Sequence, residues 1–451
     1  MGFLMASNNI FGRAAGRFSL VTLLLAGLSA CSDGGGGDKN RLEGERIPVL
    51  TFEQSLKIDQ QVASVQITLP APTVSADWPQ PGQNALHYVG HPALADSPQK
   101  IWSTDIGQGS NGRHALGGMP VIAGGKMYMI DSRAKVRAFN AETGKKLWEH
   151  EFEEKGETKK NAYGGGVTFG NGTLYITDGY GHIAAMDPSN GDVKWLTRTG
   201  IPMRGAPTYA DGRLFALTHD NQTYAVDANT GEVLWNEIGI SENAGLVGTA
   251  SPAVTGNTVI SAYSSGEVYA MRVENGRTLW TDTLSRQGRL TAMASLRDVD
   301  GDPVIYDNKV YAVSHSGRMV AIDLRSGTRI WEQNVGSQYT PWVAGDFIYV
   351  VTPESQVVCV TRREGKVRWI TQLERYKNPD DRSDPVFWSG PLLAGDRLLV
   401  TSTHGYAVSL SPYTGDILSG IDLPDGVEYG PIIANGTLYF MTTDGEVVAY
   451  R

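Results

Sequence analysis

The most chemically suggestive stretch of this sequence is a short acidic run. Asp298, Asp300 and Asp302 stand at alternate positions, and alternating carboxylates are typical of the first half of a calcium-binding loop. An EF-hand loop also needs a glutamate at its twelfth position, where this chain has Lys309. The spacing therefore argues against calcium and favours an acidic turn.

Three histidines are the next candidates for chemistry, because imidazole is a common zinc ligand. His219, His315 and His404 each stand at a similar turn, in different copies of a repeat that is described below. Copies arranged in a ring would keep the three side chains apart. The sequence therefore predicts solvated turn histidines and no metal site. No spacing suggests a Ser-His-Asp triad, so no catalytic residue is predicted.

Only two cysteines are present, Cys31 and Cys359. Cys359 occupies a small-residue position of the repeat, which predicts a buried, unreactive thiol. Cys31 follows two arginines and an apolar run, Phe18 to Ala26, that is too short to cross a membrane. This pattern predicts a secretory signal over residues 1–30, and in an ordinary secretory signal Cys31 would be incidental.

The elements that must position these residues are copies of one repeat. Its clearest copies run from Ala225 to Trp235 and from Ala321 to Trp331, with the pattern Ala-x-Asp-x-x-Thr/Ser-Gly-x-x-x-Trp. Ala ends a strand, Asp-x-x-Thr-Gly makes a turn, and the run into Trp starts the next strand. We expect the broad indole ring to pack between one sheet and the next.

The spacing of the repeat predicts the fold. Ser419 replaces tryptophan in the last full copy, and the other seven markers are Trp102, Trp148, Trp195, Trp235, Trp280, Trp331 and Trp369. Intervals of 38 to 51 residues, with four strands each, predict an all-β, eight-bladed β-propeller of four-stranded antiparallel blades. The chain ends within a copy whose missing strand stands at Lys100–Trp102. We therefore expect the N- and C-terminal strands to share one blade and close the ring.

Composition divides the chain into three parts. Residues 1–30 are predicted as the signal, residues 31–76 as Cys31 and a flexible tether, and residues 77–451 as the propeller. Loss of residues 1–30 removes two arginines and no acids, so the net charge changes from −9 to −11. Such an acidic chain is not expected to bind nucleic acid or anionic lipid through its surface.

The repeat resembles that of the quinoprotein (PQQ-dependent) dehydrogenase propellers, over about four-fifths of the chain. Those enzymes hold their quinone beneath two adjacent, disulfide-bonded cysteines, with a calcium ion and an aspartate base. This chain has no Cys-Cys pair. We therefore expect a propeller without the catalytic centre, without a cofactor and without enzymatic activity.

The tetrapeptide that ends at Cys31 resembles the bacterial lipoprotein signal, whose cysteine becomes the first mature residue and carries acyl chains such as palmitate. A lipidated Cys31 would leave Cys359 without a partner for a disulfide. The resemblance implies a lipid anchor, because buried acyl chains hold a protein to a membrane. In such proteins an aspartate after the cysteine signals retention in the inner membrane. Ser32 stands there instead, which favours the periplasmic face of the outer membrane.

The whole arrangement of signal, tether and eight blades is similar to the lipoprotein propeller family of the outer-membrane β-barrel assembly machinery. The resemblance implies a scaffold that binds the periplasmic repeat domains of the central barrel protein and aids insertion of outer-membrane proteins. Two loops make that contact in the family. Carried over, they place Leu246 and Val247 on one loop and Arg297, Asp298 and Asp300 on the other, with Val247 where family members have arginine.

Other interpretations stay open. The chain could be a PQQ-dependent oxidoreductase or its accessory subunit. It could also be a chaperone-like module that binds extended strands of nascent outer-membrane proteins along an exposed blade edge. In a purely structural interpretation, Asp298 and Asp300 only make a turn, while Leu246 packs locally.

Overall fold

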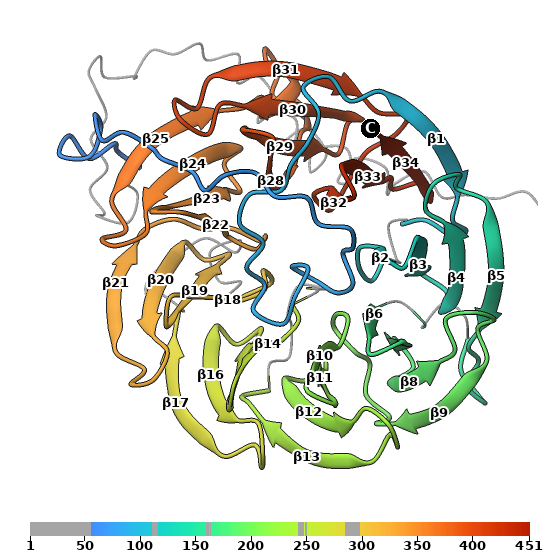
Figure 1. The fold of residues 1–451 in the computed structure, drawn as a ribbon. Helices are drawn as coiled ribbons and strands as arrows, with labels where there is room; N and C mark the ends of the chain where they lie inside the picture. The colour runs from blue at the N-terminus through green and yellow to red at the C-terminus, as the bar shows by residue number, and fades with distance from the viewer. Residues whose placement is uncertain are drawn as a thin grey trace, which may run out of the picture. The chain divides into compact units, whose positions relative to one another are not determined.

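The computed structural model describes residues 56–110, 116–158, 162, 164–241, 248, 250–284 and 298–451. They belong to one compact unit, Ser55–Arg451. Eight four-stranded antiparallel sheets form the blades of a β-propeller around a central axis (Figure 1), which confirms the predicted fold class. Within the described part of the chain, no helix is long and apolar enough to span a membrane.

Each blade places its first strand nearest the axis and its fourth at the rim (Figure 1). Seven blades use consecutive strands: β2 (Val121–Ala123), β3 (Lys126–Ile130), β4 (Lys135–Asn140) and β5 (Lys146–Glu151); β6 (Gly165–Gly170), β7 (Thr173–Asp178), β8 (His182–Met186) and β9 (Val193–Arg198); β10 (Thr208–Ala210), β11 (Arg213–Leu217), β12 (Gln222–Asp227) and β13 (Val233–Ile238); β14 (Ala253–Thr255), β15 (Thr258–Ala262), β16 (Glu267–Arg272) and β17 (Thr278–Thr283); β18 (Val304–Tyr306), β19 (Lys309–Ser314), β20 (Arg318–Asp323) and β21 (Arg329–Gln333); β22 (Trp342–Ala344), β23 (Phe347–Val351), β24 (Gln356–Thr361) and β25 (Val367–Gln372); β28 (Trp388–Ala394), β29 (Arg397–Ser402), β30 (Tyr406–Leu410) and β31 (Ile417–Asp422). A small hairpin, β26 (Tyr376–Asn378) and β27 (Ser383–Pro385), precedes the last of these blades.

The eighth blade combines both ends of the propeller chain. It holds β32 (Ile432–Ala434), β33 (Thr437–Met441) and β34 (Glu446–Tyr450), and β1 (Lys100–Asp105) adds antiparallel to β34 at the rim. Two further backbone hydrogen bonds join Gln99 and Arg451. The predicted closure of the ring by its two terminal strands is therefore confirmed.

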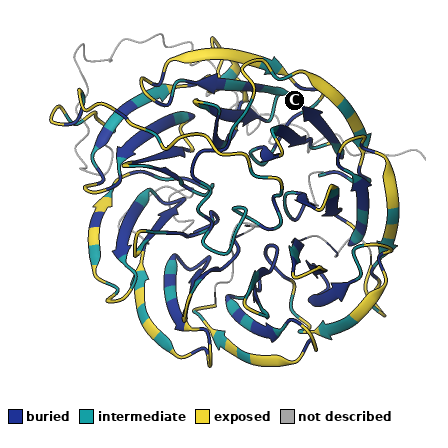
Figure 2. Cartoon of the chain, viewed as in Figure 1, coloured by how far each residue is buried: buried dark blue, intermediate teal, exposed yellow. Residues whose placement is uncertain are grey.

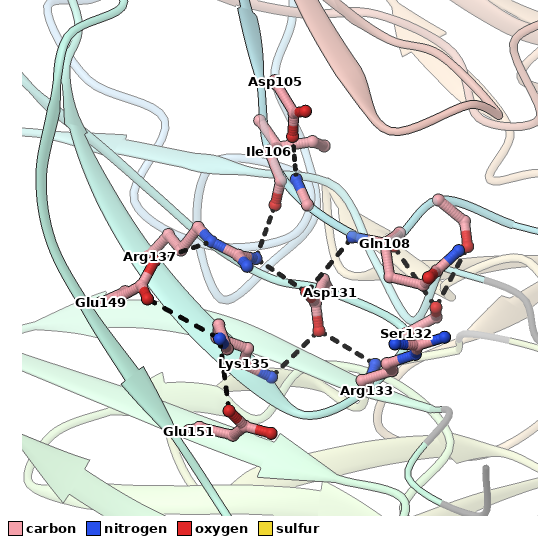
Figure 3. Close-up of polar contacts among 12 residues, drawn as sticks. Asp105, Ile106, Gln108, Asp131, Ser132, Arg133, Lys135, Arg137, Glu149 and Glu151 are labelled. Carbon is pink, nitrogen blue, oxygen red and sulfur yellow. Dashed lines mark hydrogen bonds and ion pairs between the residues drawn. The ribbon is translucent and has the colours of Figure 1, made fainter. Parts of the chain in front are cut away.

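A polar network fastens β1 to the blade that follows it around the ring (Figure 3). Arg137 on β4 donates to Asp131 at 2.7 Å and to the carbonyl of Ile106, just after β1, at 2.7 Å. The same carboxylate accepts the backbone N–H groups of Arg133 and Lys135. This ion pair is largely shielded from water, because the Arg137 and Asp131 side chains are 12% and 3% exposed.

Burial follows the position of a strand within its blade. The inner strands are mostly buried, whereas the fourth strands alternate exposed and half-buried residues (Figure 2). The apolar cores lie between neighbouring blades, so that one cluster combines Tyr128 and Ile130 of β3 with Ile176 of β7. Each blade is thus stabilised mainly by the face of the next one.

A segment that precedes the blades crosses the axis (blue, at the centre of Figure 1). We call residues 75–92 the N-terminal strap. The strap forms a hydrogen bond with every blade, and its partners are Ile122, Phe169, Tyr209, Val254, Ile305, Trp342, Gly395 and Asn435. Each partner lies on, or directly after, the first strand of its blade. The strap therefore covers one end of the axis and links all eight blades.

Residues 56–74 reach the strap along the blade of β22–β25. Asp59 donates its N–H to the carbonyl of Val367 at 2.9 Å, and Ile67 is buried in the core of this blade. The expectation of a flexible tether as far as residue 76 is corrected over this stretch, because its alternating apolar residues are used for burial. Only residues 31–55 of the predicted tether lie outside the described residues.

Candidate functional site

The predicted repeat markers lie at the seams between blades. Six tryptophans donate their indole N–H to a backbone carbonyl of the following blade, at 2.8–3.2 Å: Trp148, Trp195, Trp235, Trp280, Trp331 and Trp369. The turn glycine of the following copy lies against the same ring. A Cβ atom on Gly231, for example, would stand 2.6 Å from Trp195 Cε3. The Gly and Trp of the repeat therefore meet across copies, not within one.

The two seams of the eighth blade explain the copies that depart from the pattern, which end at Trp102 and Ser419. Trp102 covers Gly144 of the next blade, where a Cβ atom would stand 2.7 Å from the ring. The rim strand that carries Ser419 faces the blade in which β34 and β1 are separate chain ends. That blade has no Asp-x-x-Thr-Gly turn for an indole ring to cover. The missing tryptophan thus coincides with a missing turn.

The centre of the ring holds a cavity of about 470 Å³. Strap residues, including Trp78 and His87, form part of its wall, and first strands of several blades with the segments that precede them form most of the rest. Its carboxylates are Asp300, Asp302 and Glu428. The described residues contain no cluster of three or more His, Cys, Asp or Glu side chains placed to hold a metal ion.

Each cavity carboxylate already has a protein partner. Asp302 accepts the N–H of Ser251 at 2.7 Å, and Glu428 accepts the hydroxyl of Ser110 at 2.8 Å. Asp300 is paired with an arginine, as described next. These carboxylates therefore stabilise the segments around the cavity.

The acidic turn of the sequence is internal. Asp298 and Asp300 are 1% and 8% exposed. Arg204, itself 1% exposed, donates from Nη2 to Asp300 Oδ1 at 3.0 Å. It also donates to the carbonyls of Val299 and Ala262 at 3.4 Å. One arginine, placed between β9 and β10, thus joins its own blade to the next two.

The charge of Asp300 is sensitive to this environment. Burial raises the pKa of its carboxyl to about 7, the Arg204 guanidinium opposes that rise, and the Asp298 carboxylate adds to it. The acidic partner contact at Asp298 and Asp300 stays a prediction. What the structure describes is a buried ion pair beneath that loop.

The remaining predicted contact residues, Leu246, Val247 and Arg297, lie outside the described residues, as does Cys31. The described position nearest to the first loop is Gly248. A Cβ atom there would stand 2.0 Å from Asp300 Oδ1 and 2.4 Å from Arg204 Nη2. The described ends of both predicted loops therefore meet at the Arg204–Asp300 pair. Sequence reasoning missed Arg204, because it belongs to neither loop and matches no motif.

The predicted turn histidines lie in three different blades but are less exposed than expected. His315 is 7% exposed and its Nδ1 lies 3.0 Å from the Gln338 side-chain amide, while His404 pairs with Asp384 at 2.9 Å. Burial, together with the charge of Arg204, lowers the pKa of His219 to about 4. The prediction of solvated histidines is corrected, because segments that join neighbouring blades cover these turns.

A fourth histidine, which the sequence did not single out, has two carboxylate partners. His182 is 1% exposed, with Nδ1 2.8 Å from Asp178 and Nε2 2.9 Å from Glu154. Burial lowers its pKa, but the hydrogen bonds and charges of the two carboxylates outweigh burial and raise the pKa above the usual value. Glu154 follows β5, so this contact joins neighbouring blades. Cys359 is fully buried, as predicted, and burial raises its pKa.

The eight blades and their Gly–Trp seams define an eight-bladed propeller of the quinoprotein type. Among solved structures, a europium-containing methanol dehydrogenase is similar, with a TM-score of 0.63 and 14% identity over 83% of this chain and 89% of that chain. At this identity the likeness shows the fold alone. It gives no support for a shared activity.

The family is shown by sequence. The family model described as outer membrane protein assembly factor BamB matches residues 93–161 and 132–371, and the chain belongs to this family. Outer membrane protein assembly factor BamB of Yersinia pestis is 26% identical over 78% of this chain and 89% of its own. Its Escherichia coli counterpart is 28% identical over 78% and 88%. The crystal structure of BamB from Moraxella catarrhalis matches with a TM-score of 0.66 and 19% identity, over 79% of this chain and all of that chain.

Proposed function

We propose that this chain is a non-enzymatic scaffold of outer-membrane β-barrel protein assembly, located on the periplasmic side of the outer membrane. Family membership carries the proposal, because the model match covers more than half of the chain and the relatives quoted above are named outer membrane protein assembly factors. A rigid ring suits this role, since it can hold binding loops in fixed relative positions.

The proposed attachment to the membrane is a lipid on Cys31. Residues 1–30 would be removed as a signal, and residues 31–55 would connect the lipidated cysteine to the propeller. Replacing Cys31 with serine is expected to release the protein from the membrane fraction, because acyl chains supply the anchoring energy. A Cys31→Ser protein that still sediments with membranes would contradict the assignment.

The proposed partner is the central barrel insertase of the assembly machinery, bound through its periplasmic domains. The proposed contacts are Leu246 and Val247 on one loop and Arg297, Asp298 and Asp300 on or below the other. The Arg204–Asp300 ion pair supports this pairing of loops, because Arg204 contacts Asp300 directly and lies close to Gly248.

Affinity capture from solubilised outer membranes tests the partner and the loop separately. The wild-type protein is expected to recover the barrel insertase. Leu246→Asp is expected to lower recovery about tenfold or more, because a central apolar anchor supplies much of the binding energy of an interface. Leu418→Asp, an exposed leucine on the rim of another blade, is the matched control. Equal recovery of the insertase by all three proteins would refute the assignment of Leu246 as a contact. Recovery of no insertase by the wild type would refute the insertase as the partner.

A second candidate function is a PQQ-dependent oxidoreductase or its accessory subunit. The axial cavity of about 470 Å³ is the observation that favours it. Adding the quinone with Ca²⁺ and recording the absorption spectrum separates the two functions. A bound chromophore with dye-reducing activity would support the enzyme and contradict the scaffold.

A further inference from the structure

The rim of the blade β10–β13 carries an exposed apolar pair with no counterpart in the repeat. Ile238 and Ile240 are 63% and 56% exposed, and they stand three and five residues after Trp235. At the first of these positions the other seven blades have Asp105, Glu151, Arg198, Thr283, Asn334, Gln372 and Asp422. The fold therefore does not require an apolar residue there.

Other exposed apolar side chains on the rim do follow the repeat. The residue directly before the marker is apolar in six of the eight copies: Ile101, Leu147, Leu234, Leu279, Ile330 and Leu418. A side chain that recurs around the ring is explained by the repeated blade. Ile238 and Ile240 break the repeat, and an apolar pair that the fold does not need indicates an interaction.

Buried neighbours fix the backbone that carries this pair. Gly239, between the two isoleucines, donates its N–H to the carbonyl of Asn221 at 2.8 Å, and Asn221 Nδ2 donates to the carbonyl of Ile240 at 2.8 Å. The Asn221 side chain is buried, and Gly239 lies against the ring of Tyr263 in the next blade. Binding to this pair would therefore cost little ordering of the backbone.

Polar groups border the pair. Gln222 lies opposite Ile238 on β12 and donates its side-chain amide to Asp220 at 2.7 Å, while Asn236 donates to the Gln222 side-chain oxygen at 3.1 Å. β13 is the last strand of its sheet, so one side of its backbone is not paired with any strand. An apolar centre with a polar border is typical of protein interfaces.

We propose that Ile238 and Ile240 bind an extended segment of a protein partner that has apolar residues at alternate positions and a basic residue near Asp220. Side chains two residues apart on an extended segment lie on the same face, about 6–7 Å apart, and Ile238 and Ile240 are likewise two positions apart and both exposed. The unpaired side of β13 can also hydrogen-bond the backbone of that segment. The net charge of −9 disfavours a second copy of this chain or an anionic lipid surface as the occupant.

This inference rests on the proposed function and extends it, because the pair directly precedes residues 242–247 in sequence. The same barrel insertase would contact Ile238 and Ile240.

Affinity capture of the barrel insertase by a double variant, Ile238→Thr/Ile240→Thr, tests the inference. Threonine keeps a β-branched side chain at exposed positions, so the blade is expected to fold normally. Loss of two apolar contacts is expected to lower recovery about tenfold. The control is Ile417→Thr/Leu418→Thr on β31, whose side chains are 56% and 53% exposed, and it is expected to bind as the wild type does.

A photoreactive residue in place of Asn236 identifies the occupant. Crosslinks to an extended segment of the insertase would support the inference. Crosslinks to lipid or to a second copy, or unchanged recovery by the isoleucine variant, would overturn it. A wild-type protein that recovers no insertase would refute the proposed function instead.

Discussion

At the level of single side chains, the seams depend on glycine as much as on tryptophan. Gly231 has a φ of 77°, and a Cβ atom would stand 2.6 Å from Trp195. The turn therefore needs glycine twice, once for its left-handed backbone and once for contact with the indole ring. The same double requirement applies to the other turn glycines that lie against a marker tryptophan.

Gly231→Ala separates these two requirements when it is compared with Gly212→Ala. Gly212 has the same φ of 77° but open space around its Cβ position. Both variants lose about 1–2 kcal/mol from left-handed strain, and only Gly231→Ala adds a clash that costs about 1–3 kcal/mol. Urea unfolding measures both. Equal losses would mean that the ring contact is unimportant.

Breaking the buried Arg204–Asp300 ion pair is expected to lower the free energy of unfolding strongly, and replacing both residues is expected to restore it. Arg204→Met leaves Asp300 buried without its partner, which is expected to cost about 3–5 kcal/mol in the free energy of unfolding. Arg204→Met/Asp300→Leu is expected to recover most of this loss, because apolar replacement of a whole buried pair is often neutral. Chemical denaturation of the three proteins checks the pattern. A double variant as unstable as the single one would contradict it.

The contribution of His182 to stability is expected to decrease as the pH rises. Its folded pKa is raised above the unfolded value of about 6.5, so the protonated ring stabilises the fold below pH 6.5. This stabilisation is lost as the pH rises through the folded pKa. The difference in unfolding free energy between wild type and His182→Gln is therefore expected to be larger at pH 6 than at pH 9. A difference that does not vary with pH would contradict the charged contact with Asp178 and Glu154.

At the level of elements, the N-terminal strap contributes to the ring in a way that no blade does. A blade contacts its two neighbours, whereas the strap forms hydrogen bonds with all eight first strands or the turns after them. It also supplies Trp78 and His87 to the wall of the axial cavity. The strap should therefore resist opening of the ring at any seam.

Two truncations of the mature chain test the strap. Removing residues 31–72 takes away the arm along β22–β25 but keeps the strap, so a modest loss of stability is expected. Removing residues 31–92 also removes the eight strap contacts and is expected to cost about 5 kcal/mol or more beyond the first truncation, at about 0.5–1.5 kcal/mol for each hydrogen bond. Thermal and urea unfolding compare the two. Similar stability would show that the blades close without the strap.

The blades were predictable from sequence, and the strap was not. Asp, Gly and Trp recur at fixed positions because each turn and each contact between blades needs them. Counting the markers from Trp102 to Ser419 therefore predicts the number of blades. The strap binds mostly through its backbone carbonyls, which leave no mark in the sequence. The sequence predicts a tether over residues 56–74 because Pro70 and Pro72 end the apolar alternation of residues 62–69, although that alternation also suits a sheet edge.

The candidate site was only partly predictable for a related reason. Arg204 reaches Asp300 from another blade, across 96 positions of sequence. Only the assembled ring brings the two side chains together. The sequence predicts an acidic turn at Asp298 and Asp300 but does not predict that the assembled ring buries both side chains.

For the whole ring, the two ends of the axis have different roles. The strap contacts the first strands or the turns after them, whereas Gly248 and Asp298 precede the first strands of their blades, at the other end. Ile238, the last residue of the rim strand β13, lies at this second end and is exposed. A ring whose strap covers one end suits a scaffold that holds a partner on a single side.

Reconstitution of barrel insertion measures this role. The insertase is placed in proteoliposomes with an unfolded outer-membrane barrel protein, and the folded fraction is followed with and without this chain. The scaffold account predicts a higher yield or rate of folded barrel with the wild type, and a smaller effect with Leu246→Asp. Folding that is the same with and without the chain, at concentrations where it binds the insertase, would contradict the account.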